Sequence, residues 1–416
     1  MVRARRIQLN RSAGFAVAAA SLVLVFVSAG SPIPLYNTYR AQDGLSNADL
    51  SVVTAVYLSM AAASLLVLGR LSDHLGRRAV GIAALAASTT GLLVLLDVDG
   101  VAELAAGRAF QGLATGLASS ALGAYVVDIA PRRRPWLPAV VTSASPMLGI
   151  PLGALLSGAL VDHGPAPRHL NFVVVAVLLV VAAVLVALGP ETVLPEADRA
   201  RRAVASLRPR VLVPAGARRP LLAMAGLILA TWSMGGFYQA FGPSIAEEEL
   251  GSTAALTAGA VFASFTVLAF LGGPLTARVR PHRALQAGML GYAACMAGVL
   301  WALHAEATAA FLVVSLAAGI TQGVAQTGGM QTLLARTAPG ERAGLLSTVF
   351  LLNYSSAAIP SLVAGRLTTT FTLFQIACGY AVLVVVGVVA ATTLVRPVPP
   401  PPGAGRRGPS THVRQG

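Results

Sequence analysis

The chain has 416 residues, of which 56% are hydrophobic and only 11% are charged. About a quarter of the residues of an ordinary soluble domain are charged, so this composition excludes a soluble globular protein and predicts an all-α membrane protein. The formal net charge of +14 does not indicate nucleic-acid binding, because all 30 basic residues are arginines and they are spread over short segments between apolar runs.

Twelve apolar runs follow one another along the chain, and each is long enough to cross about 30 Å of hydrocarbon as a helix. We therefore predict twelve transmembrane helices, at residues 15–36, 50–69, 79–97, 102–127, 137–161, 170–189, 220–242, 255–275, 284–303, 307–331, 344–365 and 371–395. A cleaved signal peptide over residues 1–31 is the alternative for the first run, but its removal would leave an odd number of membrane crossings.

Arginines and acidic residues alternate from one connecting segment to the next. Arginines occupy the N-terminal segment and then every second segment after it. Only Arg40, Arg108, Arg168 and Arg366 fall elsewhere. The intervening segments carry Asp43, Asp49, Asp97, Asp99, Glu103, Asp162, Glu247, Glu248, Glu249 and Glu306. By the positive-inside rule, this alternation predicts a multi-pass protein of the inner cell membrane with both termini in the cytoplasm.

The two halves of the sequence share short motifs in the same order, at an offset that drifts between 204 and 211 residues. Gly69 and Leu71 recur as Gly273 and Leu275, Gln111 and Gly112 as Gln322 and Gly323, Ala130 and Pro131 as Ala338 and Pro339, and Pro151 as Pro360. This order predicts a duplicated six-helix unit, the copies being related by an axis along the membrane normal.

The predicted domains are an N-terminal bundle at 13–189 and a C-terminal bundle at 220–395. They are flanked by a cytoplasmic N-terminus at 1–12, a cytoplasmic linker at 190–219 and a disordered basic, proline-rich tail at 396–416.

The stretch GRLSDHLGRR, residues 69–78, follows the second run. It closely resembles the signature loop of the major facilitator superfamily, G-x-L-x-D-R-x-G-R-R, with His74 in place of the usual arginine. GRAFQG (107–112) is similar to the fourth-span motif of that family, and GPETV (189–193) to the end of its sixth span. SPIPLY (31–36), together with the loop, resembles bacterial transporters near the drug:proton antiporters. The resemblance implies the major facilitator fold, in which two six-helix bundles rock about a site at the membrane midplane.

The resemblance also implies a conformational latch at this loop. In the family the aspartate of the loop caps a helix of the other half, and an arginine pairs with an acid at the end of the fourth span, the place of Asp128. The predicted latch residues are Gly69, Asp73, Gly76, Arg77, Arg78 and Asp128. The alternative is a solvated turn that only fixes the topology of the chain.

Arg108 is the one ionisable residue that we place well inside a predicted span. At the centre of a helix it would cost about 2.5–3.5 kcal/mol on insertion scales, so we predict that it faces a wet cavity or a partner, and we take it as a substrate-binding candidate. Gln111 and Thr115 extend the same helical stripe. The alternative is that Arg108 lies near the outer end of its helix and reaches towards Asp97, Asp99 or Glu103.

By the same resemblance, spans 1, 4, 7 and 10 line the central cavity. This makes further substrate-binding candidates of Tyr36, Asn37, Trp232, Tyr238, Gln239, Gln322 and Gln326. Tyr57 and Asn353 are weaker candidates, because a polar or aromatic side chain in a membrane helix more often serves packing or anchoring than ligand binding.

The sequence contains no nucleotide-binding P-loop, no metal-ligand cluster and no nucleophile with an adjacent base, so we expect no enzyme, no metal and no cofactor. An ion gradient is then the expected energy source, although no Asp or Glu lies well within a predicted span. We predict a monomeric secondary transporter in the lipid bilayer that exports a small, largely apolar molecule in exchange for protons and binds no nucleic acid. The alternatives are uptake of an organic anion or a sugar, and a membrane sensor without transport activity.

Overall fold

The computed structural model describes residues 8–193, 198–209 and 211–395, and over these residues it is helical and contains no strand. The first half consists of α1 (Arg11–Gly30), α2 (Tyr36–Asp43), α3 (Asn47–Ala63), α4 (Ser72–Leu75), α5 (Arg77–Val94), α6 (Val101–Asp128), α7 (Leu137–His163) and α8 (Leu170–Ala187). After the short α9 (Arg199–Ser206), the second half consists of α10 (Arg218–Glu248), α11 (Ala255–Thr266), α12 (Gly272–Thr276), α13 (Pro281–His304), α14 (Thr308–Leu334), α15 (Arg342–Leu367) and α16 (Leu373–Leu394).

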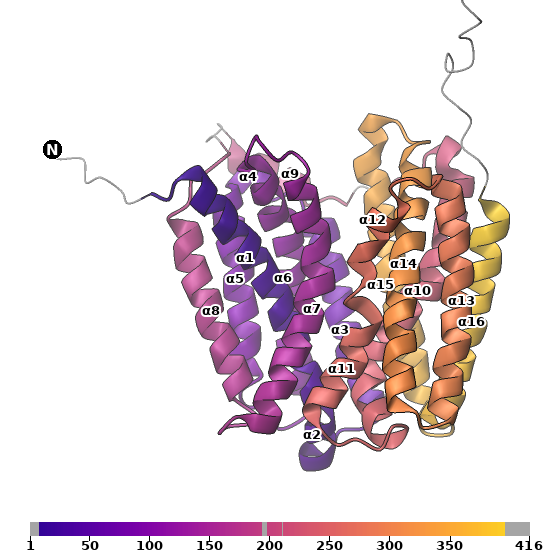
Figure 1. Cartoon of the computed structure of the whole chain (residues 1–416). Coiled ribbons are helices and arrows are strands. Elements are labelled where there is room, and N and C mark those ends of the chain that lie inside the picture. Colours follow the sequence, from indigo (N-terminus) through magenta and orange to yellow (C-terminus); the bar gives the residue numbers. More distant parts are fainter. Residues whose placement is uncertain (1–7, 194–197, 210, 396–416) are drawn as a thin grey trace, which may run out of the picture.

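Ten helical segments of the described chain are long and apolar enough to cross a membrane, where the sequence predicted twelve. Helices α5 and α6 are not among the ten. Their sequences explain this, because α5 begins with two arginines and α6 contains Glu103 and Arg108, which lower the mean hydropathy of both helices. Both nevertheless lie alongside the other long helices (Figure 1).

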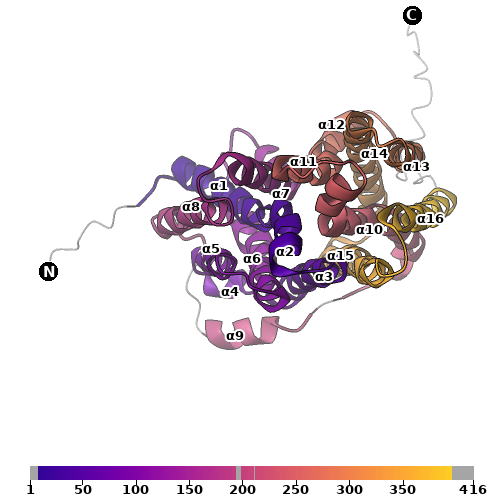
Figure 2. The ribbon, with the colours of Figure 1, turned by 90° about the horizontal axis from the view of Figure 1, so that it is seen from below.

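The helix pairings of the first half recur in the second. Helix α5 packs on α6 as α13 packs on α14, α3 packs on α6 as α11 packs on α14, and α1 packs on α7 and α8 as α10 packs on α15 and α16. The two sets meet through α7 with α11 and through α3 with α15, which lie next to each other when the molecule is seen from below (Figure 2). The spatial arrangement therefore follows the same order as the sequence motifs that the two halves share.

The molecule has two distinct ends. Helices α4, α9 and α12 lie at one end, and α2 lies at the other (Figure 1). Two residues after α9, the carbonyl oxygen of Arg208 accepts a hydrogen bond from Arg70, which precedes α4 (2.8 Å). Four residues further on, Leu212 is hydrogen-bonded through its backbone to Gly344 and Thr348 of α15. The connection between the halves is thus fastened to both of them at the α4 end.

Small residues on α7 allow it to cross α1 in close contact. A Cβ atom on Gly153 would lie 2.0 Å from the carbonyl oxygen of Val27, and one on Gly149 would lie 2.5 Å from the Phe26 side chain. One turn beyond Gly153, the Ser157 hydroxyl donates a hydrogen bond to the carbonyl oxygen of Ser31 (2.5 Å). The spacing of four residues keeps all three on one face of the helix, which is the arrangement that close packing in membranes requires.

We expect Gly153→Ala to lower the free energy of unfolding by about 1–3 kcal/mol, because the added methyl group forces two backbones apart. Gly379→Ala is the matched control, since this exposed glycine of α16 has nothing within 4 Å of its Cβ position. Alanine is the better helix former, so the control should keep or slightly raise stability. Thermal unfolding of both variants in detergent makes the comparison, and equal melting temperatures would contradict the close α1–α7 contact.

Candidate functional site

A cavity of about 220 Å³ lies between the two halves. Helices α1, α3, α6 and α7 contribute to its wall from the first half, and α10, α11, α14 and α15 from the second. The aromatic side chains on the wall are Phe26, Tyr57, Trp232, Phe262, Phe265 and Tyr354. The polar ones are Thr115, Thr231, Gln239, Thr266, Gln322 and Gln326. No residue on this wall carries a charge, so the cavity offers apolar contact and neutral hydrogen-bonding groups.

Five of the ten predicted substrate-binding residues line this cavity: Thr115, Trp232, Gln239, Gln322 and Gln326. The weaker candidate Tyr57 joins them. On α10 the lining residues fall at Trp232, Gly235, Gly236 and Gln239, a spacing that places them on one helical face. Trp232 stands edge-on to Tyr354 of α15, with ring centroids 5.6 Å apart.

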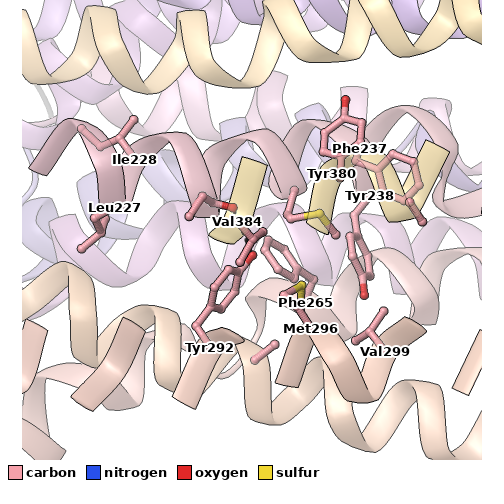
Figure 3. Close-up of a cluster of buried hydrophobic side chains, with 14 of the residues drawn as sticks. Leu227, Ile228, Phe237, Tyr238, Phe265, Tyr292, Met296, Val299, Tyr380 and Val384 are labelled. Atoms are coloured by element: carbon pink, nitrogen blue, oxygen red, sulfur yellow. Dashed lines mark hydrogen bonds between the residues drawn. The ribbon is translucent and has the colours of Figure 1, made fainter. Parts of the chain in front are cut away.

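The other predicted residues lie elsewhere. Tyr238 is one position off the cavity face of α10, and its ring is buried in the core of the second half beside Phe237, Phe265 and Tyr380 (Figure 3). Its hydroxyl pairs with Ser315 (2.8 Å). Asn353 is also buried and not on the wall. The neighbouring Tyr354 faces the cavity instead, because successive helical residues point about 100° apart.

Sequence reasoning missed the contributions of α7, α11 and α15, because it took the cavity wall from spans 1, 4, 7 and 10 alone. Thr266 and Tyr354 could be recognised only as hydroxyl-bearing residues in an apolar run. Many threonines and tyrosines of this chain share that feature. The interior prolines of α7, Pro146 and Pro151, were a better clue. A proline inside a helix has no N–H group, so the carbonyl four residues earlier loses its hydrogen-bond donor. In a membrane protein such a carbonyl is tolerated where the helix borders other protein segments or a cavity.

Arg108 is fully buried and does not line the cavity, so of its two predicted surroundings, a wet cavity or a partner, it has the partner. Its guanidinium donates to the carbonyl oxygen of Ala29 (2.6 Å) and to Oε1 of Gln111 (2.8 Å). Its charged carbon lies 4.2 Å from the centroid of the Tyr57 ring, and the Tyr57 side chain forms part of the cavity wall. Arg108 also does not reach towards the outer acidic residues, so the alternative reading is wrong.

The reason lies in the SPIPLY segment, where α1 ends. Pro32 has no N–H group, so it cannot donate to the carbonyl of Ser28 four residues earlier. The Ser31 hydroxyl (2.8 Å) and the Gln111 side chain (Nε2 to oxygen, 2.8 Å) donate to that carbonyl instead, and Arg108 bonds to the next carbonyl, that of Ala29. The two motif residues of α6 therefore serve the broken end of α1, which holds both of them away from the cavity.

Tyr36 and Asn37 follow this break and lie beyond the cavity, towards the α2 end. Tyr36 is fully buried, and the Asn37 amide donates to the carbonyl oxygen of Pro243 in the second half (2.7 Å). Three residues on, Arg40 forms ion pairs with Glu247 (3.3 Å) and Glu248 (2.6 Å). These contacts join the two halves at the α2 end.

Further contacts close the same end. The Ser244 hydroxyl donates to Oδ1 of Asn47 (2.7 Å), and the carboxylate of Asp162 accepts from the first two backbone N–H groups of α11, those of Ala255 (2.9 Å) and Leu256 (2.8 Å). Within the described part of the chain, every hydrogen bond that a side chain of α1–α8 makes to α10–α16 lies at this end. Among the described residues, the direct bonds between the two sets of helices thus lie at the α2 end, and at the α4 end the halves are linked through the connection that Arg70 and Thr348 hold.

The GRLSDHLGRR loop lies at the opposite end, where it bonds to the first half and, through Arg70, to the connection between the halves. Arg77 pairs with Asp73, and its Nε lies 3.1 Å from Asp128 of α6, as the resemblance implied. Thr192 also donates to Asp128 (2.9 Å). The predicted cap by Asp73 on a helix of the other half is not formed here, because among the described residues its side chain contacts Arg77 only.

Glu191, from the GPETV segment, is a member of this cluster that the sequence analysis did not single out. Its carboxylate accepts from the backbone N–H groups of Arg77 (3.1 Å) and Arg78 (3.2 Å), the first two residues of α5. A negative charge there is favoured by the helix dipole. Gly76 makes room for it: its φ is +102°, and a Cβ would lie 2.7 Å from Glu191. Gly69 begins the loop at the end of the α3 segment, and Arg78 bonds to the carbonyl of Ala187.

The sequence model of the Major Facilitator Superfamily matches residues 18–362, which is most of the chain. The chain belongs to this superfamily. The match begins inside α1 and ends inside α15, so it covers every helix on the cavity wall. The superfamily member described here is therefore a multi-pass membrane transporter that handles a small molecule within the lipid bilayer.

We expect Arg108→Ala to lower the free energy of unfolding by about 1–3 kcal/mol for each polar group that it leaves unpaired, here the Ala29 carbonyl and Gln111. Arg108→Lys should restore only part of this loss, since lysine lacks the planar fork that spans both acceptors. Thermal unfolding in detergent measures both. The control is Arg366→Ala, because Arg366 is exposed at the end of α15. If Arg108→Ala is no less stable than this control, the structural role assigned to Arg108 is wrong.

Proposed function

We propose that this transporter exports small, largely apolar compounds in exchange for protons, by alternating access. The observation that carries the proposal is the uncharged cavity between the two halves, whose α2 end is bridged by Arg40, Glu247 and Glu248, whereas at the α4 end no described side chain of α1–α8 bonds directly to α10–α16. Such a cavity can exchange its contents with one side of the membrane at a time when the halves rock about it.

The proposed architecture is twelve transmembrane helices in two six-helix bundles, 13–189 and 220–395, joined by the linker 190–219. Helices α5 and α6 complete the count, since they pack together as their counterparts α13 and α14 do. We place the α4 end in the inner cytoplasmic compartment, together with both termini. The positive-inside rule supports this, because Arg70, Arg77 and Arg78 lie at the α4 end.

The wall chemistry supports an apolar substrate, and a cavity bridged at its outer end is the state in which an exporter takes up its substrate from the cytoplasm. Uptake of an organic anion is the weaker candidate. It would need a positive group on the cavity wall, and the guanidinium of Arg108 lies behind Tyr57.

Proton coupling is assigned to the ends of the cavity, since its wall carries no carboxylate. Asp128 pairs with Arg77 at the inner end, and Glu247 and Glu248 pair with Arg40 at the outer end. Protonation of a carboxylate weakens such an ion pair and so favours the state that lacks it.

A reversible lock tests the transport proposal. Asn47→Cys combined with Ser244→Cys, in a chain with Cys295→Ser and Cys378→Ser, places two thiols where the hydroxyl and amide oxygens now lie 2.7 Å apart. Oxidation should hold the outer end closed. Cells that express the locked chain should then accumulate at least one uncharged apolar compound, measured by mass spectrometry of intracellular pools, and dithiothreitol should reverse the change.

The single variant Asn47→Cys, treated with the same oxidant, is the control and should show no accumulation. An uncoupler should reproduce the accumulation in cells with the unlocked chain. A fall of an intracellular compound on locking would show uptake instead, and identical pools in all strains would favour a sensor without transport. Either result would overturn the proposed function.

A further inference from the structure

The two sides of the cavity differ in how their polar groups are used. On the first-half side, the hydroxyl groups of Tyr57 and Thr115 lie 3.4 Å apart and pair with each other. The rest of that side is apolar and includes Phe26, Leu58 and Ile150. The two hydroxyl groups that the first half places on the wall are therefore paired with each other, and this side offers a ligand mainly apolar contact.

The second-half side carries amides that are not occupied. The side chains of Gln239, Gln322 and Gln326 make no hydrogen bond to another described residue. In addition, Oε1 of Gln322 and the hydroxyl of Thr266 are buried without a partner. An unpaired polar group is unfavourable in the membrane interior. Because no internal bond holds these groups, they can turn towards a ligand without breaking one.

The electrostatics of the cavity disfavour charged ligands of both signs. Arg108 lies behind Tyr57, and its hydrogen-bond partners are the Ala29 carbonyl and the Gln111 amide, so no carboxylate offsets its charge. A cation in the cavity is repelled. An anion would lose its hydration and find only neutral donors on the wall, because the buried guanidinium is covered by the tyrosine ring.

We infer that the cavity binds uncharged molecules that have a flat apolar face and hydrogen-bonding groups along one edge. Gln322 is the specificity-determining residue of that edge, with Gln239, Gln326 and Thr266 beside it. The apolar face lies against the first half and beside the edge-to-face pair of Trp232 and Tyr354. The inference rests on the proposed function in one respect, that the molecule bound in this cavity is the one transported.

Binding of three probes that share one ring system tests the inference: 2-naphthamide, which is neutral, 2-naphthoate, and the trimethyl(2-naphthyl)ammonium cation. Equilibrium dialysis of the purified full chain in detergent, corrected with empty micelles, gives the affinity of each. The amide should bind about tenfold more tightly than either charged probe. Equal or tighter binding of a charged probe, or no binding of the amide, would overturn the inference.

Gln322→Glu adds a carboxylate of nearly the same shape to the amide side of the cavity. It should raise the affinity for the ammonium probe about tenfold and weaken binding of the amide probe. Gln331→Glu is the matched control, because Gln331 is exposed on the same helix and lies off the cavity wall. If both variants change the affinities alike, Gln322 does not set the selectivity and the inference fails.

Binding at equilibrium needs no gradient and no second compartment, so it is independent of transport. A chain that binds 2-naphthamide as expected, but whose locked form leaves intracellular pools unchanged, would refute the proposed function alone. A chain that passes the locking experiment but prefers a charged probe would refute only the inference about the ligand.

Discussion

The rest of this structure depends on which groups donate hydrogen bonds to the last backbone carbonyls of α1. A backbone carbonyl in the hydrocarbon region must find a donor within the protein. Pro32 removes the helical donor for Ser28, and the hydroxyl of Ser31 together with Gln111 of α6 supplies donors in its place. Arg108 of α6 does the same for Ala29. Beyond this point the chain turns into α2, whose residues Asn37 and Arg40 reach the second half. The buried arginine of α6 thus supports the segment that leads to the contacts at the α2 end.

Much of the helix layout could be predicted from the sequence, because apolar runs and the alternation of charges report directly on membrane crossing. The cavity residues of α10 and α14 were also accessible, since Trp232, Gln239, Gln322 and Gln326 are polar or amphipathic side chains on apolar helices. The place of Arg108 was not. Its sequence context shows that the charge needs partners, but not whether these partners are water, substrate or the carbonyls of another helix. These partners lie at the break of α1 before Pro32, more than seventy residues earlier in the chain.

Both halves carry the same Gln-Gly motif, and the two glutamines make different contacts. Gln111 is bound to the carbonyl of Ser28, whereas its counterpart Gln322 lines the cavity with no protein partner for its carbonyl oxygen among the described residues. The helices of the two halves also differ. Helix α1 ends at Gly30, before Pro32, whereas α10 runs for 31 residues and continues through Pro243. The free carbonyls at the end of α1 therefore give Gln111 a partner, and Gln322 faces the cavity.

The fastening of the connection between the halves sets a mechanical limit on the transport cycle. The carbonyl of Arg208 is tied to Arg70, and Leu212 is tied to Thr348, so only four residue steps separate the two anchors. A fully extended chain spans at most about 3.6 Å per residue, so the segment from Arg208 to Leu212 can be no longer than about 14 Å. Any rocking that separates the anchor points further must first detach one of them. The amplitude of opening on the α4 side is therefore limited by a length of polypeptide, independently of the side chains that face the cavity.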